Sequence, residues 1–143
     1  MASAEGNRTE VTRLGLFLKS VGYPERAPEG ASVFTLRVDG MEVIAEERDG
    51  HIVLSYAVSD NDSLLPALAR YSAGRMLRED AALTWDNGAF LWQDVPADAS
   101  QAEMARVFER FMDSCDWWRE RVDALHGGKA SAGAAMESMM IRP

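Results

Sequence analysis

Few residues of this chain have the type and spacing that catalysis or metal binding requires. The two histidines, His51 and His126, lie far apart in the sequence, and neither has a second ligand at i, i+4 spacing. His51 starts an alternating apolar run, and His126 falls in the last turn of a predicted helix, where a cation suits the helix dipole. We predict structural or solvent-exposed roles for both histidines, and no metal site.

The other reactive side chains also lack partners in the sequence. Cys115 lies on the apolar stripe of the predicted last helix, where a thiol behaves as a small hydrophobe. Glu46, Glu47 and Asp49 could form an acid pair, but solvated carboxylates are common near hairpin turns. No glycine-rich phosphate-binding pattern is present. We therefore predict a protein that is not an enzyme and uses no cofactor.

The composition limits the partners. The 143 residues suffice for one domain, and 23 acidic against 15 basic residues give a net charge of −8. This charge disfavours nucleic acids and anionic membrane surfaces, which attract lysine and arginine clusters. The first residues do not resemble a secretory signal, and no apolar run approaches the roughly 18 residues of a membrane span. With a single cysteine, the chain fits a reducing compartment, so we predict a cytoplasmic protein.

The first half of the chain predicts a helix followed by three strands. After Thr9, apolar residues recur at helical spacing until Gly22 and Pro24. Three alternating runs then follow, separated by Asp39-Gly40 and Asp49-Gly50, which are typical of tight turns in an antiparallel meander. The second face of this meander is also partly apolar, through Val33, Ile44, Val53 and Ala57.

The second half predicts a helix, a hairpin and a helix. Asp62 or Ser63 is expected to cap the second helix. The stretch LTWDNGAFLWQDVP, residues 83–96, indicates a hairpin whose arms are apolar on both faces. Ser100 and Glu103 form a capping box for the last helix, whose apolar stripe spans residues 104–125 and ends at Gly127-Gly128. That stripe fits a helix lying on a sheet, with a coiled-coil seam as the alternative.

Together these elements predict an α+β fold. The order is helix, three-strand antiparallel meander, helix, two-strand hairpin and helix, with the helices packed on a twisted antiparallel sheet. Residues 9–126 form the single domain, residues 1–8 a disordered N-terminus, and residues 127–143 a flexible tail. Apolar surface that remains after one core is built usually marks protein–protein contact.

Three stretches of the chain carry a resemblance to a known family. They are TRLGLFLKSVGYP, VFTLRVDGMEVIAEERDGHIVLSYAV, and the hairpin with the final helix, so that residues 9–125 are covered. In spacing and element order they resemble the class I type III secretion chaperones of Gram-negative bacteria, the Tir-chaperone type. The resemblance implies a cytoplasmic homodimer without ATPase activity. Such a dimer holds the extended N-terminal segment of a secreted effector by apolar patches and by strand addition, and keeps it secretion-competent.

The resemblance also implies positions for both contacts. In the family, the second helix and the adjacent strand form the dimer interface, which corresponds here to Leu65, Leu68, Ala69, Ser72, Met76 and Trp85. We expect the second subunit to cover the second apolar face of the hairpin. We expect the effector on the outer meander face and the first helix, with acidic rims steering a basic segment, at Val33, Thr35, Ile44, Val53, Leu14 and Phe17.

Two alternatives stay open. A protein of the same fold can sequester a transcriptional regulator instead of an effector, and the sequence does not separate these roles. A small α+β ligand-binding protein or enzyme would instead need an enclosed pocket with convergent polar groups.

Overall fold

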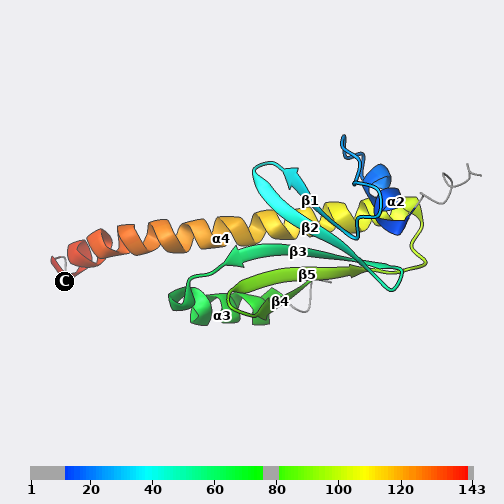
Figure 1. Cartoon of the computed structure of the whole chain (residues 1–143). Coiled ribbons are helices and arrows are strands. Elements are labelled where there is room, and N and C mark those ends of the chain that lie inside the picture. Colours follow the sequence, from blue (N-terminus) through cyan, green and yellow to red (C-terminus); the bar gives the residue numbers. More distant parts are fainter. Residues whose placement is uncertain (1–11, 76–80, 142–143) are drawn as a thin grey trace, which may run out of the picture.

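The computed structural model describes residues 12–75 and 81–141, with side chains as far as His126. The elements follow the predicted α+β order of helix, three strands, helix, hairpin and long helix (Figure 1). Their bounds are α2 Arg13–Ser20, β1 Val33–Val38, β2 Met41–Arg48, β3 His51–Ser59, η1 Asp62–Leu64, α3 Leu65–Arg75, β4 Ala82–Trp85, β5 Ala89–Val95 and α4 Gln101–Ile141.

The strands form one five-stranded antiparallel sheet in the order β1-β2-β3-β5-β4. The predicted meander is confirmed, because Val38 pairs with Met41 and Arg48 with His51 across two-residue turns. Asp39 and Asp49 have φ of 52° and 51°, and each is followed by a glycine with positive φ. These left-handed angles are what tight hairpins need, and glycine tolerates them readily.

The predicted hairpin at residues 83–96 is confirmed as β4 and β5. Trp85 pairs with Ala89 across a three-residue turn, in which Asn87 has φ of 56°. The hairpin then adds to the meander through β5, and Tyr56 of β3 lies opposite Leu91. The β5–β3 pairing aligns the faces of the hairpin with those of the meander.

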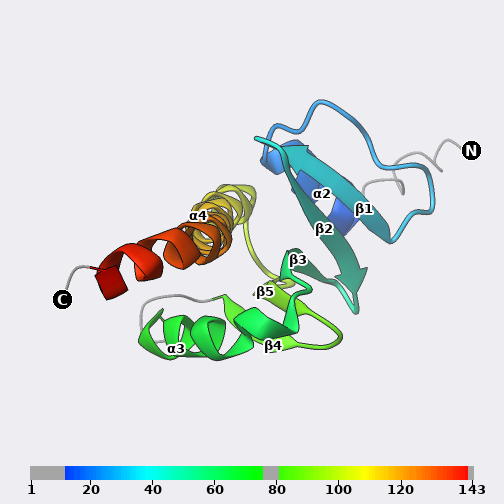
Figure 2. The same ribbon diagram turned by 90° about the vertical axis from the view of Figure 1, so that its left-hand side faces the viewer.

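One face of the sheet, called the inner face, carries the core. In Figure 2, α4 lies to one side of β2 and β3, and α3 lies beside β4. The buried cluster combines inner-face strand residues with side chains of all the described α-helices. Its largest fully buried members are Trp118, Phe17, Phe111, Leu14, Leu36, Ile52, Leu54, Leu68, Leu91, Met104, Val43 and Val95.

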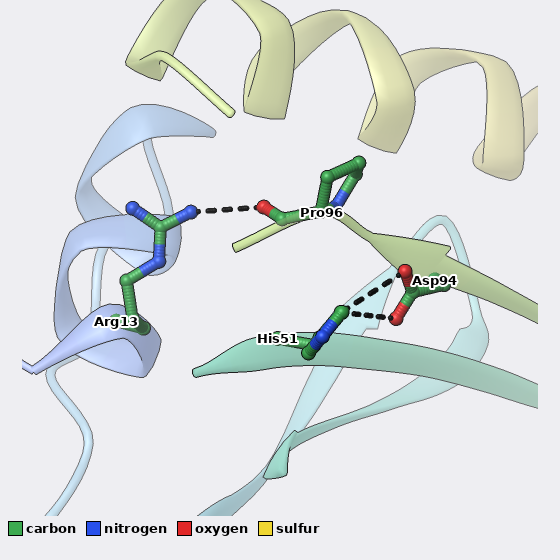
Figure 3. A network of polar contacts seen from close by, with 4 residues as sticks. All are labelled: Arg13, His51, Asp94 and Pro96. Carbon is green, nitrogen blue, oxygen red and sulfur yellow. Dashed lines mark hydrogen bonds and ion pairs between the residues drawn. The ribbon is translucent and has the colours of Figure 1, made fainter. Parts of the chain in front are cut away.

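The first described helix, α2, is capped by Thr12, whose hydroxyl accepts a hydrogen bond from the Gly15 N–H at 2.9 Å. Arg13 ties the same end to the loop before α4, since its Nη2 donates to the Pro96 carbonyl oxygen at 3.1 Å (Figure 3). The predicted start at Thr9 lies outside the described residues.

The other helix starts show one correction and one confirmation. Asn61 is the cap that precedes α3, one residue before the predicted Asp62, and it begins a short 3₁₀ turn. The capping box of α4 is confirmed, because the Ser100 N–H donates to Glu103 Oε1 at 2.7 Å and the Glu103 N–H donates to Ser100 Oγ at 3.1 Å.

The last helix is longer than predicted. The sequence predicts its end at Gly127-Gly128, but α4 continues to Ile141, a length of about 60 Å at 1.5 Å per residue. Each glycine costs a helix only about 1 kcal/mol relative to alanine, and the following residues are rich in alanine and methionine, which favour helix. The apolar stripe of α4 lies on the sheet, as the first of the two interpretations expects. Among the described residues, no helix is long and apolar enough to cross a membrane.

Candidate interaction surfaces

The face of the sheet opposite the core, called the outer face, carries a row of side chains in which large apolar residues alternate with small polar ones. Strand register places Trp92 opposite Ser55, Ser55 opposite Ile44, and Ile44 opposite Thr35, so this row crosses four strands. Trp92 is 39% exposed and Ile44 is 41% exposed. Val33, two residues before Thr35 on β1, is 48% exposed. Large apolar side chains at such exposure on adjoining strands form a surface suited to a protein partner.

Two flanking rows widen this surface. Phe90 lies opposite Ala57 and is half-buried. On the other side, Val53 lies between Asp94 of β5 and Glu46 of β2, and is also half-buried. The second apolar face of the hairpin is therefore continuous with the outer face of the meander.

The charged groups around the outer face are arranged in pairs. Arg37 Nε lies 3.2 Å from Glu42 Oε2, and Arg48 Nη2 lies 2.9 Å from Glu46 Oε1. The hydrogen bond from Arg48 to Glu46 raises the pKa of the guanidinium further. His51 Nδ1 lies 3.1 Å from Asp94 Oδ1 (Figure 3).

This pairing changes the expected electrostatics of the outer face. The sequence predicts acidic rims, but two of these carboxylates, Glu42 and Glu46, lie in contact with arginine side chains, while His51 beside Asp94 is charged only when it is protonated. Opposite charges in contact largely cancel at a distance, where salt screens what remains. The outer face therefore presents apolar surface with local charge pairs, and its main attraction for a partner is burial of that apolar surface.

The outer edge of the sheet at β1 is partly occupied by the chain itself. The backbone N–H of Arg37 donates to the Tyr23 hydroxyl at 3.0 Å, and the Tyr23 ring packs edge-on against Phe34 with centroids 5.6 Å apart. In an antiparallel strand, alternate residues direct their backbone groups to the same side. The backbone N–H and C=O groups of Val33 and Thr35 therefore point to the same edge as those of Arg37. They lie along β1 beyond the part of the edge that Tyr23 covers.

The second candidate surface is the face of α3 that points away from the core. Leu68 is fully buried and Tyr71 is half-buried against the core. Leu65, Ala69 and Ala73, at i, i+4 and i+8 spacing, form an exposed stripe beside this buried face, with Leu65 36% exposed. Small side chains on a helix allow a second backbone to approach closely.

The structure divides the residues predicted for the dimer interface. Leu65 and Ala69 lie on the exposed face of α3, and Ser72 is half-buried at its border. Trp85 is half-buried and packs against the core from β4. Leu68 is a correction, because it is fully buried within the single chain and is therefore a core residue. Met76 lies outside the described residues.

The residues predicted for effector contact also divide. Val33, Thr35 and Ile44 are exposed on the outer face, and Val53 is half-buried there. Leu14 and Phe17 are corrections, since both are fully buried and hold α2 against the sheet and α4. The Phe17 ring packs edge-on against Phe108, with centroids 5.7 Å apart. A helix of only eight residues presents its apolar face to the core, so periodicity marked packing and not a binding site.

The sequence predicts Trp92 only as part of the apolar hairpin, whose second face the second subunit is expected to cover, and it predicts no role for Tyr23. Trp92 shares the outer face with Ile44, with Ser55 between them, because β5 pairs with β3, a long-range pairing that the sequence does not reveal. The sequence signal for its exposure is its position between Leu91 and Gln93, because neighbouring residues of a strand point to opposite faces of the sheet. Tyr23 followed a predicted helix end in a loop, and nothing in its neighbourhood indicated a contact with the backbone of Arg37.

The structure shows the surroundings of several residues with reactive side chains. Cys115 is buried in the core, and His126 is exposed on α4. Glu47 points to the inner face, where its Oε1 accepts a hydrogen bond from the Leu14 N–H at 3.1 Å. Within the part of the chain that the structure describes, no group of three or more histidine, cysteine, aspartate or glutamate residues could hold a metal ion. What the described arrangement offers is two surfaces for recognition.

Comparison with known proteins adds no family. No protein-family model matches the chain, and no curated protein matches it significantly.

Proposed function

We propose that this protein is a dimeric, ATP-independent chaperone of the class I type III secretion type. It holds the N-terminal segment of a secreted effector in the bacterial cytoplasm and keeps that segment soluble until export. The observation that carries the proposal is the set of exposed apolar side chains Trp92, Ile44 and Val33 on the outer face of a sheet whose other face carries the core. The resemblance in element order supplies the class of partner.

The outer face and the β1 edge suit an extended polypeptide. An added strand would form backbone hydrogen bonds with Val33 and Thr35, and its alternate side chains would lie beside the side chains of these two residues on the outer face. Tyr23 blocks the Arg37 end, which favours a short segment over a full-length strand. Because the charges of this face are paired, the segment is expected to be apolar at alternate positions, with few charges of its own.

The second copy of the chain is assigned to the exposed face of α3. A two-fold interface uses the same patch on both subunits, and Leu65 with Ala69 and Ala73 forms an apolar patch with small side chains at its centre. This arrangement keeps the homodimer contact separate from the outer face, so that both partners can bind at once.

A regulator on the same fold is the alternative, since an extended segment of a transcriptional regulator would fit the same surface. An affinity purification from the native cytoplasm, followed by light scattering of the eluted complex, separates the possibilities. Two copies of this chain with one secreted protein, bound through its N-terminal region, support the chaperone. Two copies with a transcriptional regulator support the alternative, and a monomer without a protein partner contradicts both.

A further inference from the structure

The junction between α3 and α4 is built around one half-buried side chain, Trp117. The Tyr71 ring of α3 meets the Trp117 ring edge-on, with centroids 5.9 Å apart and planes at 88°. Arg75, also on α3, places its Cζ 4.0 Å from the centroid of the same indole. From α4 itself, Arg121 Cζ lies 4.8 Å from that centroid, and the Trp118 ring packs edge-on at 5.1 Å. Trp117 therefore links both α3 residues to the helix that spans the core.

The remaining attachment of α3 is small. Among the described residues of α3, Leu68 is the one buried side chain, and Leu64 is buried in the short turn that precedes the helix. Leu68, Tyr71 and Arg75 have i, i+3 and i+7 spacing, so they share one face of the helix. Two attachment points along this face, Leu68 in the core and the stack on Trp117, fix the rotation of α3. The exposed stripe beside this face then carries Leu65, Ala69 and Ala73.

We propose that Trp117 is a positioning residue for the α3 surface, and that through it the core sets the geometry presented to a second copy of the chain. This inference rests on the proposed homodimer for its functional consequence. A two-fold contact requires both subunits to present the patch in the same orientation, so a helix that can roll would lower the affinity.

The chemistry of the junction explains why tryptophan suits this position. The indole face attracts guanidinium groups more strongly than the other aromatic rings, and its edge accommodates a second aromatic ring. Leucine at position 117 would retain apolar volume but lose both the stacking of Arg75 and the edge contact of Tyr71. Phenylalanine would retain a weaker form of both contacts.

Two measurements on the full chain test this inference. In the first, hydrogen exchange compares α3 with β2 and β3 in the wild type, in Trp117→Leu and in Trp117→Phe. In the second, sedimentation measures the dissociation constant of the dimer. We expect Trp117→Leu to accelerate exchange in α3 and to weaken the dimer, each by about tenfold, because aromatic and cation–π contacts of this kind are each worth roughly that factor. For Trp117→Phe we expect an exchange rate and a dissociation constant between those of the wild type and of Trp117→Leu. This variant provides the test if Trp117→Leu does not fold.

Trp92→Leu is the matched control, since it makes the same replacement at a tryptophan that is exposed on the outer face. It should leave both the exchange of α3 and the dimer unchanged. Unchanged exchange in α3 of the Trp117 variants, or equal acceleration in β2 and β3, would overturn the inference. A wild-type protein that is monomeric at every concentration would instead overturn the proposed homodimer, and the exchange comparison would still decide whether Trp117 positions α3.

Discussion

The backbone N–H of Leu14, in the first turn of α2, donates a hydrogen bond to the carboxylate of Glu47, which lies on β2. The donor and acceptor are 33 residues apart in sequence, and the Oε1 atom is 3.1 Å from the nitrogen. The first turn of a helix leaves N–H groups without intrahelical partners, and a negative charge there also suits the helix dipole. The strand therefore supplies one cap of the helix, and Thr12 supplies the other.

Replacing Glu47 with alanine should destabilise the protein. The Leu14 N–H would lose its acceptor at a partly buried site, which typically costs about 1–2 kcal/mol. Urea denaturation measures the loss as a lower midpoint with an unchanged slope. Glu47→Gln is the control, because its amide oxygen can still accept the hydrogen bond, and its loss should be smaller. Equal midpoints for the wild type and the alanine variant would contradict this role.

Leu68 and Ala69 are neighbours on α3, but aspartate at the two positions should have opposite consequences. Leu68→Asp places a carboxylate in a fully buried position and should cost more than about 3 kcal/mol, enough to unfold a marginal domain. Ala69→Asp alters the exposed face and should leave the fold intact while preventing dimer formation. Circular dichroism with light scattering separates unfolded chains from folded monomers. A folded dimer of Ala69→Asp would move the interface away from this face.

The sequence predicts the elements of this fold better than their surfaces. Turn residues with a defined backbone requirement, such as Asp39-Gly40, and reciprocal caps, such as Ser100 with Glu103, mark local structure that depends on few neighbours. The exposure of Leu68 or Phe17 depends instead on which elements pack together, and periodicity shows only that one helix face is apolar. For the same reason Trp92 could not be assigned to the outer face before the pairing of β5 with β3 was known.

Ile44 and Leu65 have similar exposure on different surfaces, 41% and 36%, and so provide a crossed test of the two proposed contacts. Ile44→Ser should weaken binding of the partner recovered with the wild type, and should leave the dimer unchanged. Leu65→Ser should weaken the dimer and leave the outer face intact. Each serine removes on the order of 1–2 kcal/mol of apolar burial, which is about tenfold in affinity.

The same two variants serve as controls for one another. Titration calorimetry gives the affinity for the partner segment, and sedimentation gives the affinity of the dimer. Loss of partner binding in both variants would show that the two surfaces are not independent. Loss in neither variant would place the partner site elsewhere on the molecule.

Tyr23→Phe removes the hydroxyl that accepts the Arg37 N–H at the β1 edge while keeping the ring that packs on Phe34. The variant should lose about 1 kcal/mol of stability, because one hydrogen bond is exchanged for contact with water. The amide of Arg37 should exchange its hydrogen faster, as residue-resolved hydrogen exchange can measure. If a partner segment adds to β1, the vacated edge should also bind it more tightly. If the Arg37 amide exchanges at the same rate in Tyr23→Phe as in the wild type, Tyr23 does not protect this edge.

The start of α4 should make a pH-dependent contribution to stability. The backbone N–H of Ser100, followed by its side chain, lowers the pKa of Glu103 from its ordinary value. A carboxylate with a lowered pKa in the folded state stabilises the protein above its unfolded pKa of about 4.3, and loses that contribution as the pH falls through the folded pKa.

Glu103→Gln removes the titrating group, so the wild type should be the more stable protein at pH 7 and should lose this advantage towards pH 3. Denaturation at both pH values measures the difference, with the exposed Glu109→Gln as the control on the same helix. A difference of equal size at pH 7 and pH 3 would show that the ionised carboxylate of Glu103 does not contribute to the cap.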